Sequence, residues 1–384
     1  MTSWILAIDF GTTHTVSVAL VGDRNPEVVE IDGERRVPST VLVLPDGGTL
    51  IGHAAEALSL SYPGGTLRAV KARLGNSAPI ILNGKPHQVV TLVATYLRSI
   101  SQAVIEQIGS PPAEVRLTHP VSWNRPLRQR LVEAAGKAGL DQVVLVAEPV
   151  AAAVAYAADA GLASGEHVAI YDLGGGTFDC AILRGGDFAV LGQGSGDQNI
   201  GGELFDELMM NDIGEQLDPG VWDRIQVADD PVWLRARVGL RNEARKAKEA
   251  LSNSSAVDAF IALPAGLQQV GVSRAAFEAL ARPYIAESVE LMRRCIVDAG
   301  LQPAEVSAIA LIGGASRSPI VSEMVIAAFP GMSVSRRGDP KASVALGAAM
   351  AARPIALPRQ PLGNRITQPA SPGTAPEGVH LAPP

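Results

Sequence analysis

Cysteine is nearly absent from the sequence. Cys180 and Cys295 are the only two among 384 residues. Two cysteines are too few for a disulfide framework, and their separation does not match the paired spacing of a zinc site. We therefore expect a protein of a reducing compartment, the cytoplasm.

Basic stripes and long apolar runs are also missing. The chain has 32 Lys and Arg against 39 Asp and Glu, a formal net charge of −7, and its basic residues are dispersed, unlike those of a nucleic-acid surface. The start, MTSWILAIDFG, has no basic region and is interrupted by Asp9, so it does not look like a signal peptide. The most apolar later stretch contains Glu148, Pro149 and Asp159. We expect no nucleic-acid partner and no membrane segment within this chain.

Hydrophobic side chains, by contrast, make up 47% of the chain. At this length they can form a large core, and the length suggests two lobes. Short β-branched runs alternate with Ala-rich helical patterns, which is typical of an α/β fold. Strands are predicted at 4–8, 16–21, 143–146, 167–171, 180–183 and 308–312, and long helices at 127–138, 232–252 and 275–299.

The sequence contains an approximate internal repeat. WILAIDFGTTHTVSVALVGD, starting at Trp4, resembles HVAIYDLGGGTFDCAILRGGD, starting at His167. Each copy reads as a strand, an Asp, a Gly/Thr turn and a second strand. The matching residues Asp9 and Asp172 are 163 positions apart. Two copies of one fold half would bring the two turns face to face.

The repeat divides the chain into two predicted lobes, 1–165 and 166–352. The second lobe is expected to include an inserted helical subdomain at about 205–305, with a strand pair near 257–263 and a helix beginning at Ser273. The segment 353–384 contains eight prolines and no long apolar period, which predicts a disordered tail or linker.

Glycine-rich turns follow three of the predicted strands. In YDLGGGTFD, the carboxylates of Asp172 and Asp179 flank three glycines. Glycines let backbone N–H groups approach phosphate oxygens, and carboxylates suit a hydrated Mg²⁺. Alone, this motif also fits a tight hairpin turn. The second copy, DFGTT starting at Asp9, favours two turns that share one metal-triphosphate.

The third turn is IGGASRSP, starting at Ile312. Ser318 as N-cap and Pro319 at the first helical position predict a helix start. Two glycines without side chains, Gly313 and Gly314, with Arg317 beside them, leave a flat surface that suits a purine base and its sugar. A simple strand-to-helix turn is the alternative.

The order of these motifs resembles the heat-shock-70 branch of the actin-like ATPase superfamily. The resemblance spans about residues 4–352 and includes VAEPVAAAVAYAAD, LGGGTFDCAIL, GGELFDELM, ARKAKEALS, SRAAFEAL and IGGASRSP. It implies an α/β actin-like ATPase fold, with two lobes around a nucleotide cleft. It also implies ATP or ADP and Mg²⁺ as ligands, with K⁺ as an optional further cation.

The resemblance implies a role for each matching residue. Lys71 matches the lysine that the family has beside the γ-phosphate, where a cation stabilises charge developing in phosphoryl transfer. Taken alone, it would be a surface lysine. The implied catalytic residues are Lys71, Glu148, Asp172 and Thr177. The implied phosphate contacts are Gly11, Thr12, Thr13, His14, Gly174, Gly175, Gly176, Gly201 and Gly202, and Mg²⁺ would be held through water by Asp9, Asp172 and Asp179.

The adenosine end departs from the family pattern. Its implied contacts are Arg245, Lys248, Ser252, Gly313, Gly314 and Arg317. Arg245 stands where the family commonly has a glutamate for the ribose, and Glu249 replaces a residue that often packs on the base. Lys341 also replaces an acid near the base. A guanidinium at Arg245 can stack on adenine, but the nucleotide preference is expected to differ.

Two further features concern communication. Pro120 and Arg128 match a proline and an arginine that the family uses as an interlobe switch. Alternatively, they are a strand end and a surface charge. The surface that the family uses for J-domain co-chaperones is altered at Val144, Ala147 and Val150. The expected partners are therefore a co-chaperone or a nucleotide-exchange factor, with standard J-domain docking left open.

The leading interpretation is an ATP-binding, slowly hydrolysing nucleotide switch, the ATPase domain of a heat-shock-70-like chaperone without the substrate-binding domain. One alternative is an actin-like protein that forms filaments with ATP. Another is a pseudo-ATPase that binds nucleotide without hydrolysis, prompted by Arg245 and Lys341. A sugar kinase would need a general-base carboxylate, where this chain has Lys71.

Overall fold

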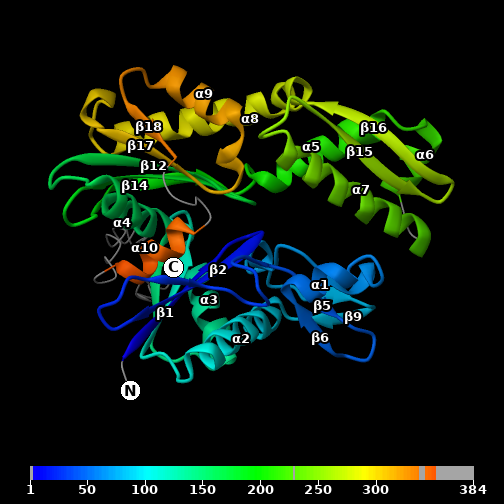
Figure 1. Cartoon of the computed structure of the whole chain (residues 1–384), viewed down its shortest axis with the longest axis horizontal. Helices are drawn as coiled ribbons and strands as arrows, with labels where there is room; N and C mark the ends of the chain where they lie inside the picture. Colours follow the sequence, from blue (N-terminus) through cyan, green and yellow to red (C-terminus); the bar gives the residue numbers. More distant parts are fainter. Residues whose placement is uncertain (1–2, 228–229, 337–341, 352–384) are drawn as a thin grey trace, which may run out of the picture.

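Two β-sheets of the same topology form the framework of the chain (Figure 1). The computed structural model describes residues 3–227, 230–336 and 342–351. The first sheet has the order β11-β10-β1-β2-β3, with β4 paired to β2, and the second has the order β14-β13-β12-β17-β18. The strands of the first sheet are β1 Trp4–Phe10, β2 His14–Val21, β3 Glu27–Val29, β4 Val37–Pro38, β10 Glu114–His119 and β11 Val143–Ala147. Those of the second are β12 His167–Leu173, β13 Phe178–Arg184, β14 Val190–Asp197, β17 Ala308–Ile312 and β18 Ser333–Ser335.

The internal repeat is visible in the strand pairing. β1 runs antiparallel to β2 and parallel to β10, while β12 runs antiparallel to β13 and parallel to β17. Asp9 and Asp172 occupy the same next-to-last position of the seven-residue strands β1 and β12. The predicted repeat is therefore confirmed as a repeated topology that carries both acids to equivalent strand ends.

Helices cover both faces of each sheet. Leu6 and Ile8 of β1 pack with α2 (Val89–Ile108) and α3 (Arg125–Ala138), whereas Ala7 packs with α4 (Glu148–Ala160) and α10 (Ser343–Met350). In β12, Tyr171 packs with α8 (Arg274–Asp298) and α9 (Pro319–Ala328), and Ile170 packs with α4 and α10. Because side chains alternate along a strand, α4 and α10 share one core with both sheets and join the two halves.

The contact between α4 and α10 depends on small side chains. The buried residues of both helices are mostly alanine and valine. A Cβ added at Gly347 of α10 would lie 1.7 Å from the backbone oxygen of Ala151 in α4. The two backbones therefore touch at a point where only glycine fits.

Each half carries a further group of elements, and the two groups lie on the same side of the molecule (Figure 1). The first half adds the sheet β6-β5-β7, the hairpin β8-β9 and α1, and the second adds α5, α6, α7 and the hairpin β15-β16. The bounds in the first half are β5 Val41–Val43, β6 Thr49–Ile51, α1 Gly52–Leu58, β7 Thr66–Leu67, β8 Ile80–Leu82 and β9 Lys85–His87. Those in the second are α5 Gly202–Glu215, α6 Pro219–Gln226, α7 Pro231–Ala250, β15 Ala256–Leu263 and β16 Gly266–Ser273. In the described part of the chain there are also four 3-10 turns, namely Pro63–Gly65, Val70–Arg73, Pro303–Glu305 and Ala315–Arg317.

The predicted strands and helices are all present in the structure. Their ends differ by a few residues, and β17 matches its predicted bounds. Ser273 caps α8 by accepting a hydrogen bond from the backbone N–H of Ala276 at 3.2 Å. Ser318 is the N-cap of α9 and Pro319 is its first residue, so the predicted helix start is confirmed, although the Ser318 hydroxyl makes no capping hydrogen bond. Ser318 also lines a cavity.

Some predictions fall outside the described residues, namely those for Lys341 and for 353–384. Within the described part of the chain, no helix has both the length and the apolar character needed to cross a bilayer.

Candidate functional site

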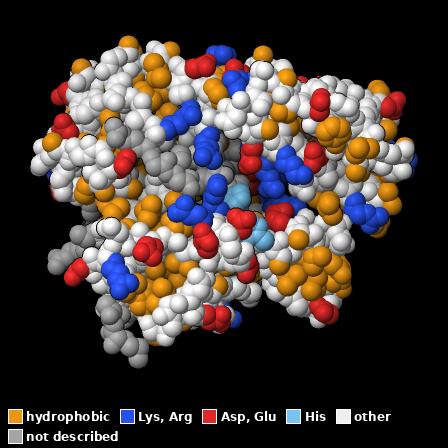
Figure 2. All heavy atoms as spheres, in the orientation of Figure 1, with side chains coloured by type: hydrophobic (Ala, Val, Ile, Leu, Met, Phe, Trp, Pro, Cys, Tyr) orange, Lys and Arg blue, Asp and Glu red, His pale blue; other side chains and the backbone are white. Residues whose placement is uncertain are grey.

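A cavity of about 780 Å³ lies between the two halves, and Figure 2 shows the corresponding hollow in the molecular surface. Its walls come from the ends of β1 and β12, from the turns that follow them, and from α5, α7 and the loop after β17. This volume is in the range of cavities that hold small molecules and cofactors. The predicted site residues that line it are Asp9, Gly11, Thr12, Thr13, His14, Lys71, Glu148, Asp172, Gly174, Gly175, Thr177, Gly202, Arg245, Lys248, Ser252, Gly313, Gly314 and Arg317.

The two repeated turns meet directly at one end of the cavity. A Cβ added at Gly175 would lie 2.3 Å from Cγ2 of Thr13, and one at Gly176 would lie 2.5 Å from Cγ2 of Thr12. Only glycine leaves room for this approach. The expected face-to-face arrangement of the turns is therefore present.

Four acidic side chains gather beneath these turns. Asp9, Asp172, Asp179 and Glu148 are all buried or nearly so. Burial, followed by repulsion from Glu148, raises the pKa of Asp9 to about 6 and that of Asp179 to about 7. The same two causes, joined by the charges of Asp179 and Asp9, raise the pKa of Asp172 well above its usual range. The carboxylates repel one another, so the cluster favours an additional cation.

Lys71 is the basic partner of this cluster. Its Nζ lies 2.6 Å from Oε1 of Glu148, and the two side chains are only 4% and 9% exposed. The ammonium group also lies 5.4 Å from the ring centroid of Trp123, within cation–π distance. The default expectation of a surface lysine is therefore wrong, because Lys71 is held in the interior by a carboxylate and an aromatic ring.

The end of β10 and the segment that follows it contact two of the four acids, Asp9 and Asp179. Thr118 donates a hydrogen bond to Oδ1 of Asp9 at 2.7 Å, and the backbone N–H of Ser122 donates to Oδ1 of Asp179 at 3.3 Å. Pro120 lies between these two contacts, and its carbonyl oxygen is 2.7 Å from Nδ1 of the buried His119. A movement of the Asp9 or Asp179 side chain can therefore be transmitted to this segment through these hydrogen bonds.

Helix α7 forms the opposite wall. Lys248 makes an ion-pair contact of 2.5 Å with Asp206 and donates to the backbone oxygen of Gly202 at 2.9 Å. Arg245 and Ser252 lie one turn away on either side and also line the cavity. Three of the implied adenosine contacts, Arg245, Lys248 and Ser252, therefore line the cavity together.

The third glycine turn closes the far end. Gly313 has φ of +82°, and an added Cβ there would lie 2.3 Å from the backbone oxygen of Leu173. The turn therefore needs glycine both for its backbone conformation and for its contact with the end of β12.

Five predicted residues are near the cavity but do not line it. Gly176 and Gly201 pack against each other behind the wall, where a Cβ on Gly201 would lie 2.5 Å from the carbonyl carbon of Gly176. Asp179 is buried beneath the turns, and Pro120 lies in the connecting segment. Arg128 stands in the first turn of α3.

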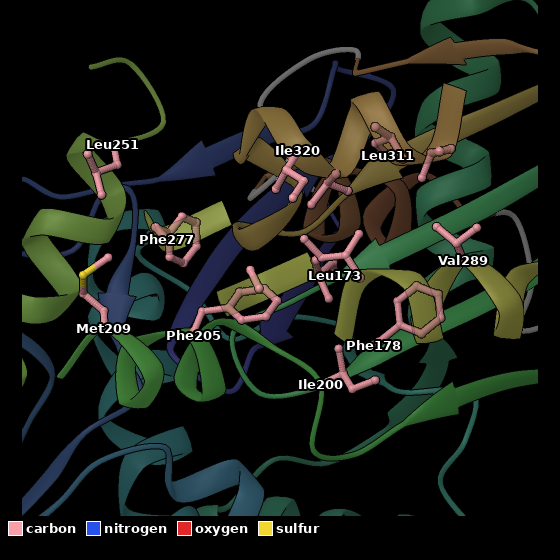
Figure 3. Packing of buried hydrophobic residues seen from close by; sticks show 14 of the residues in the cluster. Leu173, Phe178, Ile200, Phe205, Met209, Leu251, Phe277, Val289, Leu311 and Ile320 are labelled. Carbon is pink, nitrogen blue, oxygen red and sulfur yellow. The ribbon is translucent and has the colours of Figure 1, made fainter. Parts of the chain in front are cut away.

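Other lining residues were not predicted. Phe205 and Phe277 form an edge-to-face pair with centroids 6.1 Å apart, in the core between α5 and α8 (Figure 3). Asp206 is one residue further along α5, and Arg36 and Arg336 come from loops. Phe205 and Asp206 belong to the GGELFDELM segment, so the family resemblance could have indicated them. Arg36 and Arg336 are single residues outside the quoted motifs.

The chemistry of the residues fits a Mg-nucleotide. Among the described residues, no group of three His, Cys, Asp or Glu side chains is arranged to bind a metal ion directly. The buried carboxylates with raised pKa values suit a hydrated cation, because Mg²⁺ usually keeps several of its waters. The two glycine turns and their hydroxyls suit phosphate oxygens.

Two sheets of repeated topology around such a cavity form the actin-like ATPase fold expected from the sequence. A family model described as "Hsp70 protein" matches residues 80–358. The chain belongs to the Hsp70 family.

Known relatives agree with this assignment. The chain is 36% identical over 381 residues to "Chaperone protein HscA homolog" of Azotobacter vinelandii, an alignment that covers 91% of this chain. It is 35% identical over 377 residues to the protein of the same name of Acidithiobacillus ferrooxidans, covering 90% of this chain. The chain spans 58% of the length of each of these relatives.

Proposed function

We propose that the cavity binds Mg·ATP and that the chain hydrolyses it slowly as a nucleotide switch. The observation that carries this proposal is the meeting of two acid-bearing glycine turns beside the buried pair of Lys71 and Glu148. A triphosphate needs backbone donors on both sides and a cation for its charge. The cavity offers both.

In this proposal the phosphates lie between the two turns, held by Gly11, Thr12, Thr13, Gly174, Gly175 and Gly202, with Gly176 and Gly201 supporting them from behind and His14 beside them. Bound Mg²⁺ would neutralise charge on the phosphate oxygens. Asp9, Asp172 and Asp179 would orient its water ligands. K⁺ would be a further cation of the same site.

Lys71 is the proposed catalytic cation. Its ammonium group is fixed by Glu148 at 2.6 Å, so it needs little reorganisation to stabilise negative charge that develops on the phosphoryl group and the attacking water. Asp172 and Thr177 would complete the catalytic group, at the end of β12 and in the turn after it.

The switch would act through the contact between the halves. We assign the lobes to 1–165 and 166–352, with the helical insertion at about 205–305. The segment that carries Pro120 touches Asp9 through Thr118 and Asp179 through Ser122. Movement of these acids on nucleotide binding would pass along this segment to Arg128 in α3, and lobe closure of this kind is a hinge transition.

For the whole protein we propose a cytoplasmic chaperone ATPase of the Hsp70 type. The relatives named "Chaperone protein HscA homolog" support this, with 35–36% identity. A co-chaperone or a nucleotide-exchange factor is the proposed kind of partner. Val144, Ala147 and Val150 leave standard J-domain docking open.

The test separates binding from hydrolysis. Lys71→Ala should lower the single-turnover hydrolysis rate by roughly a hundredfold, while calorimetry still detects ATP binding. Lys246→Ala is the matched control, because Lys246 is exposed on α7, pairs with Glu243 and is not among the residues that line the cavity. Unchanged hydrolysis in the Lys71 variant would reject its catalytic role. A wild-type chain that binds ATP without releasing phosphate would be a pseudo-ATPase.

A further inference from the structure

The outer part of the cavity carries an excess of positive charge. Four arginines line it, namely Arg36 before β4, Arg245 on α7, Arg317 in the loop after β17, and Arg336 after β18. Within the described ranges, none of the four forms an ion pair with a carboxylate. Figure 2 shows Lys and Arg side chains on both sides of the hollow.

The nearby acids do not neutralise these arginines. Asp206 is already engaged by Lys248 at 2.5 Å. Glu56 lies within electrostatic range of Arg245, but its carboxylate is held by Arg68 at 3.0 Å, and Arg68 is the main cause that lowers the pKa of Glu56 against its burial. Glu249 is the remaining described acid of the lining on this side. Four guanidinium groups therefore face one free carboxylate.

Two of the arginines are held close together. Arg336 donates hydrogen bonds to the backbone oxygens of Arg317 at 3.1 Å and Ser318 at 3.3 Å, and to Oγ of Ser322 at 2.8 Å. Partial burial and the charge of Arg317 lower the pKa of Arg336. Two like charges in one wall repel each other, and an anionic ligand would relieve this repulsion.

Arg245 is the most informative of the four. It lies one turn from Lys248 on the face of α7 that lines the cavity. Lys248 reaches the backbone oxygen of Gly202, one of the proposed phosphate contacts. If the phosphates lie there, Arg245, one turn away on the same face, is positioned to contact the adjoining sugar. In dinucleotide-binding folds, an acid in such a place accepts hydrogen bonds from free ribose hydroxyls, whereas an arginine accommodates a phosphate on the ribose. Guanidinium groups bind phosphates through two parallel hydrogen bonds.

We propose that the preferred ligand is a purine nucleotide with a phosphate ester on its ribose in addition to its 5′-polyphosphate chain. The inference rests on the proposed function, because it assumes that the 5′ chain lies between the two glycine turns. Arg245 binds the ribose phosphate, and Arg317, Arg336 and Arg36 supply the surrounding positive potential.

The experiment compares three nucleotides by calorimetry in the presence of Mg²⁺: ADP, adenosine 3′-phosphate 5′-diphosphate and adenosine 2′-phosphate 5′-diphosphate. One of the two nucleotides with a phosphate on the ribose should bind at least about tenfold more tightly than ADP, because hydrogen bonds to charged groups are stronger than those between neutral groups. Added salt should reduce this preference.

Variants of α7 test the assigned residue. Arg245→Glu should abolish the preference for ribose phosphate over ADP. Arg235→Glu makes the same charge change on an exposed part of the same helix, away from the lining, and should keep the preference. Arg336→Gln, which retains hydrogen-bonding groups, should reduce the preference and guards against misfolding of the first variant.

The outcomes separate the two proposals. If ADP binds and neither ribose phosphate binds more tightly, this inference is wrong and the proposed function stands. A preference that survives Arg245→Glu also overturns the assignment. If none of the three nucleotides binds, the proposed function fails and the inference fails with it.

Discussion

The contact between the two glycine turns can be tested with a single methyl group. Gly175→Ala would place its Cβ 2.3 Å from Cγ2, 2.6 Å from Oγ1 and 3.0 Å from Cβ of Thr13. Rotation of the Thr13 side chain would move Cγ2 and Oγ1, but Cβ would remain too close. The backbone of Gly175 lies outside the left-handed region, so alanine suits its conformation. The effect of the substitution is therefore the steric separation of the two turns.

The size of the effect follows from the packing. An extra methyl in a tightly packed site costs about 1–3 kcal/mol, which corresponds to roughly 5- to 150-fold weaker binding if the cost is borne by the closed, ligand-bound arrangement. Calorimetric titration with Mg·ATP measures this directly. The free energy of unfolding without nucleotide should change less, because the turns can separate in the absence of a ligand.

A matched control and a rescue sharpen this test. Gly239→Ala adds the same methyl in α7, where nothing lies within 4 Å. It should stabilise the chain by about 0.5–1 kcal/mol through the helix alone and leave ATP affinity unchanged. Combining Gly175→Ala with Thr13→Ala removes two of the three close atoms and should recover part of the binding. Wild-type affinity for ATP in the Gly175 variant would refute the reasoning.

Three further predictions concern buried polar groups. Arg116→Met should lower the free energy of unfolding by about 2–4 kcal/mol in denaturant titration, because this buried guanidinium donates to three backbone oxygens at the end of α10; an unchanged midpoint would contradict this. Burial and Glu148 raise the pKa of Asp179 to about 7, so without Mg²⁺ this residue alone should lower the stability by up to about 4 kcal/mol as pH rises from 4 to 7. Asp179→Asn should remove that share of the pH dependence and leave the share of Asp9 and Asp172. Cys180 and Cys295 are free and buried, so a thiol reagent should modify neither until the chain unfolds, and modification under native conditions would disprove their burial.

The framework could be predicted because its signals are local. β17 and the strand that carries Asp172 are apolar runs followed by glycine, and the repeat of the Asp-turn pattern predicts two copies of one fold half. Strands such as β4 and β7 have two residues each, too few for any period. Their pairing depends on contacts between distant segments, which a single sequence does not encode locally.

The candidate site also contains residues that local sequence signals predict and residues that only the folded structure brings together. The glycine turns were predictable because phosphate binding demands glycine at fixed spacing. Arg36 and Arg336 were not, because each is a single loop residue that only the folded chain brings to the cavity. The burial of Lys71 also required the structure, since both Glu148 and Trp123, which hold it, come from other elements.

The charges of the cavity constrain its ligand from both ends. Four buried carboxylates gather near Lys71 at one end, and the pKa values of three of them, Asp9, Asp172 and Asp179, are raised. An added cation would lower the repulsion among these carboxylates. Four arginines face the single free carboxylate of Glu249 at the other, and an added anion would do the same for them. A nucleotide with Mg²⁺ on its polyphosphate and a phosphate on its sugar would supply a cation to the carboxylates and an anion to the arginines. Chelation of the metal should therefore weaken the polyphosphate end, while added salt should act mainly on the more exposed arginines.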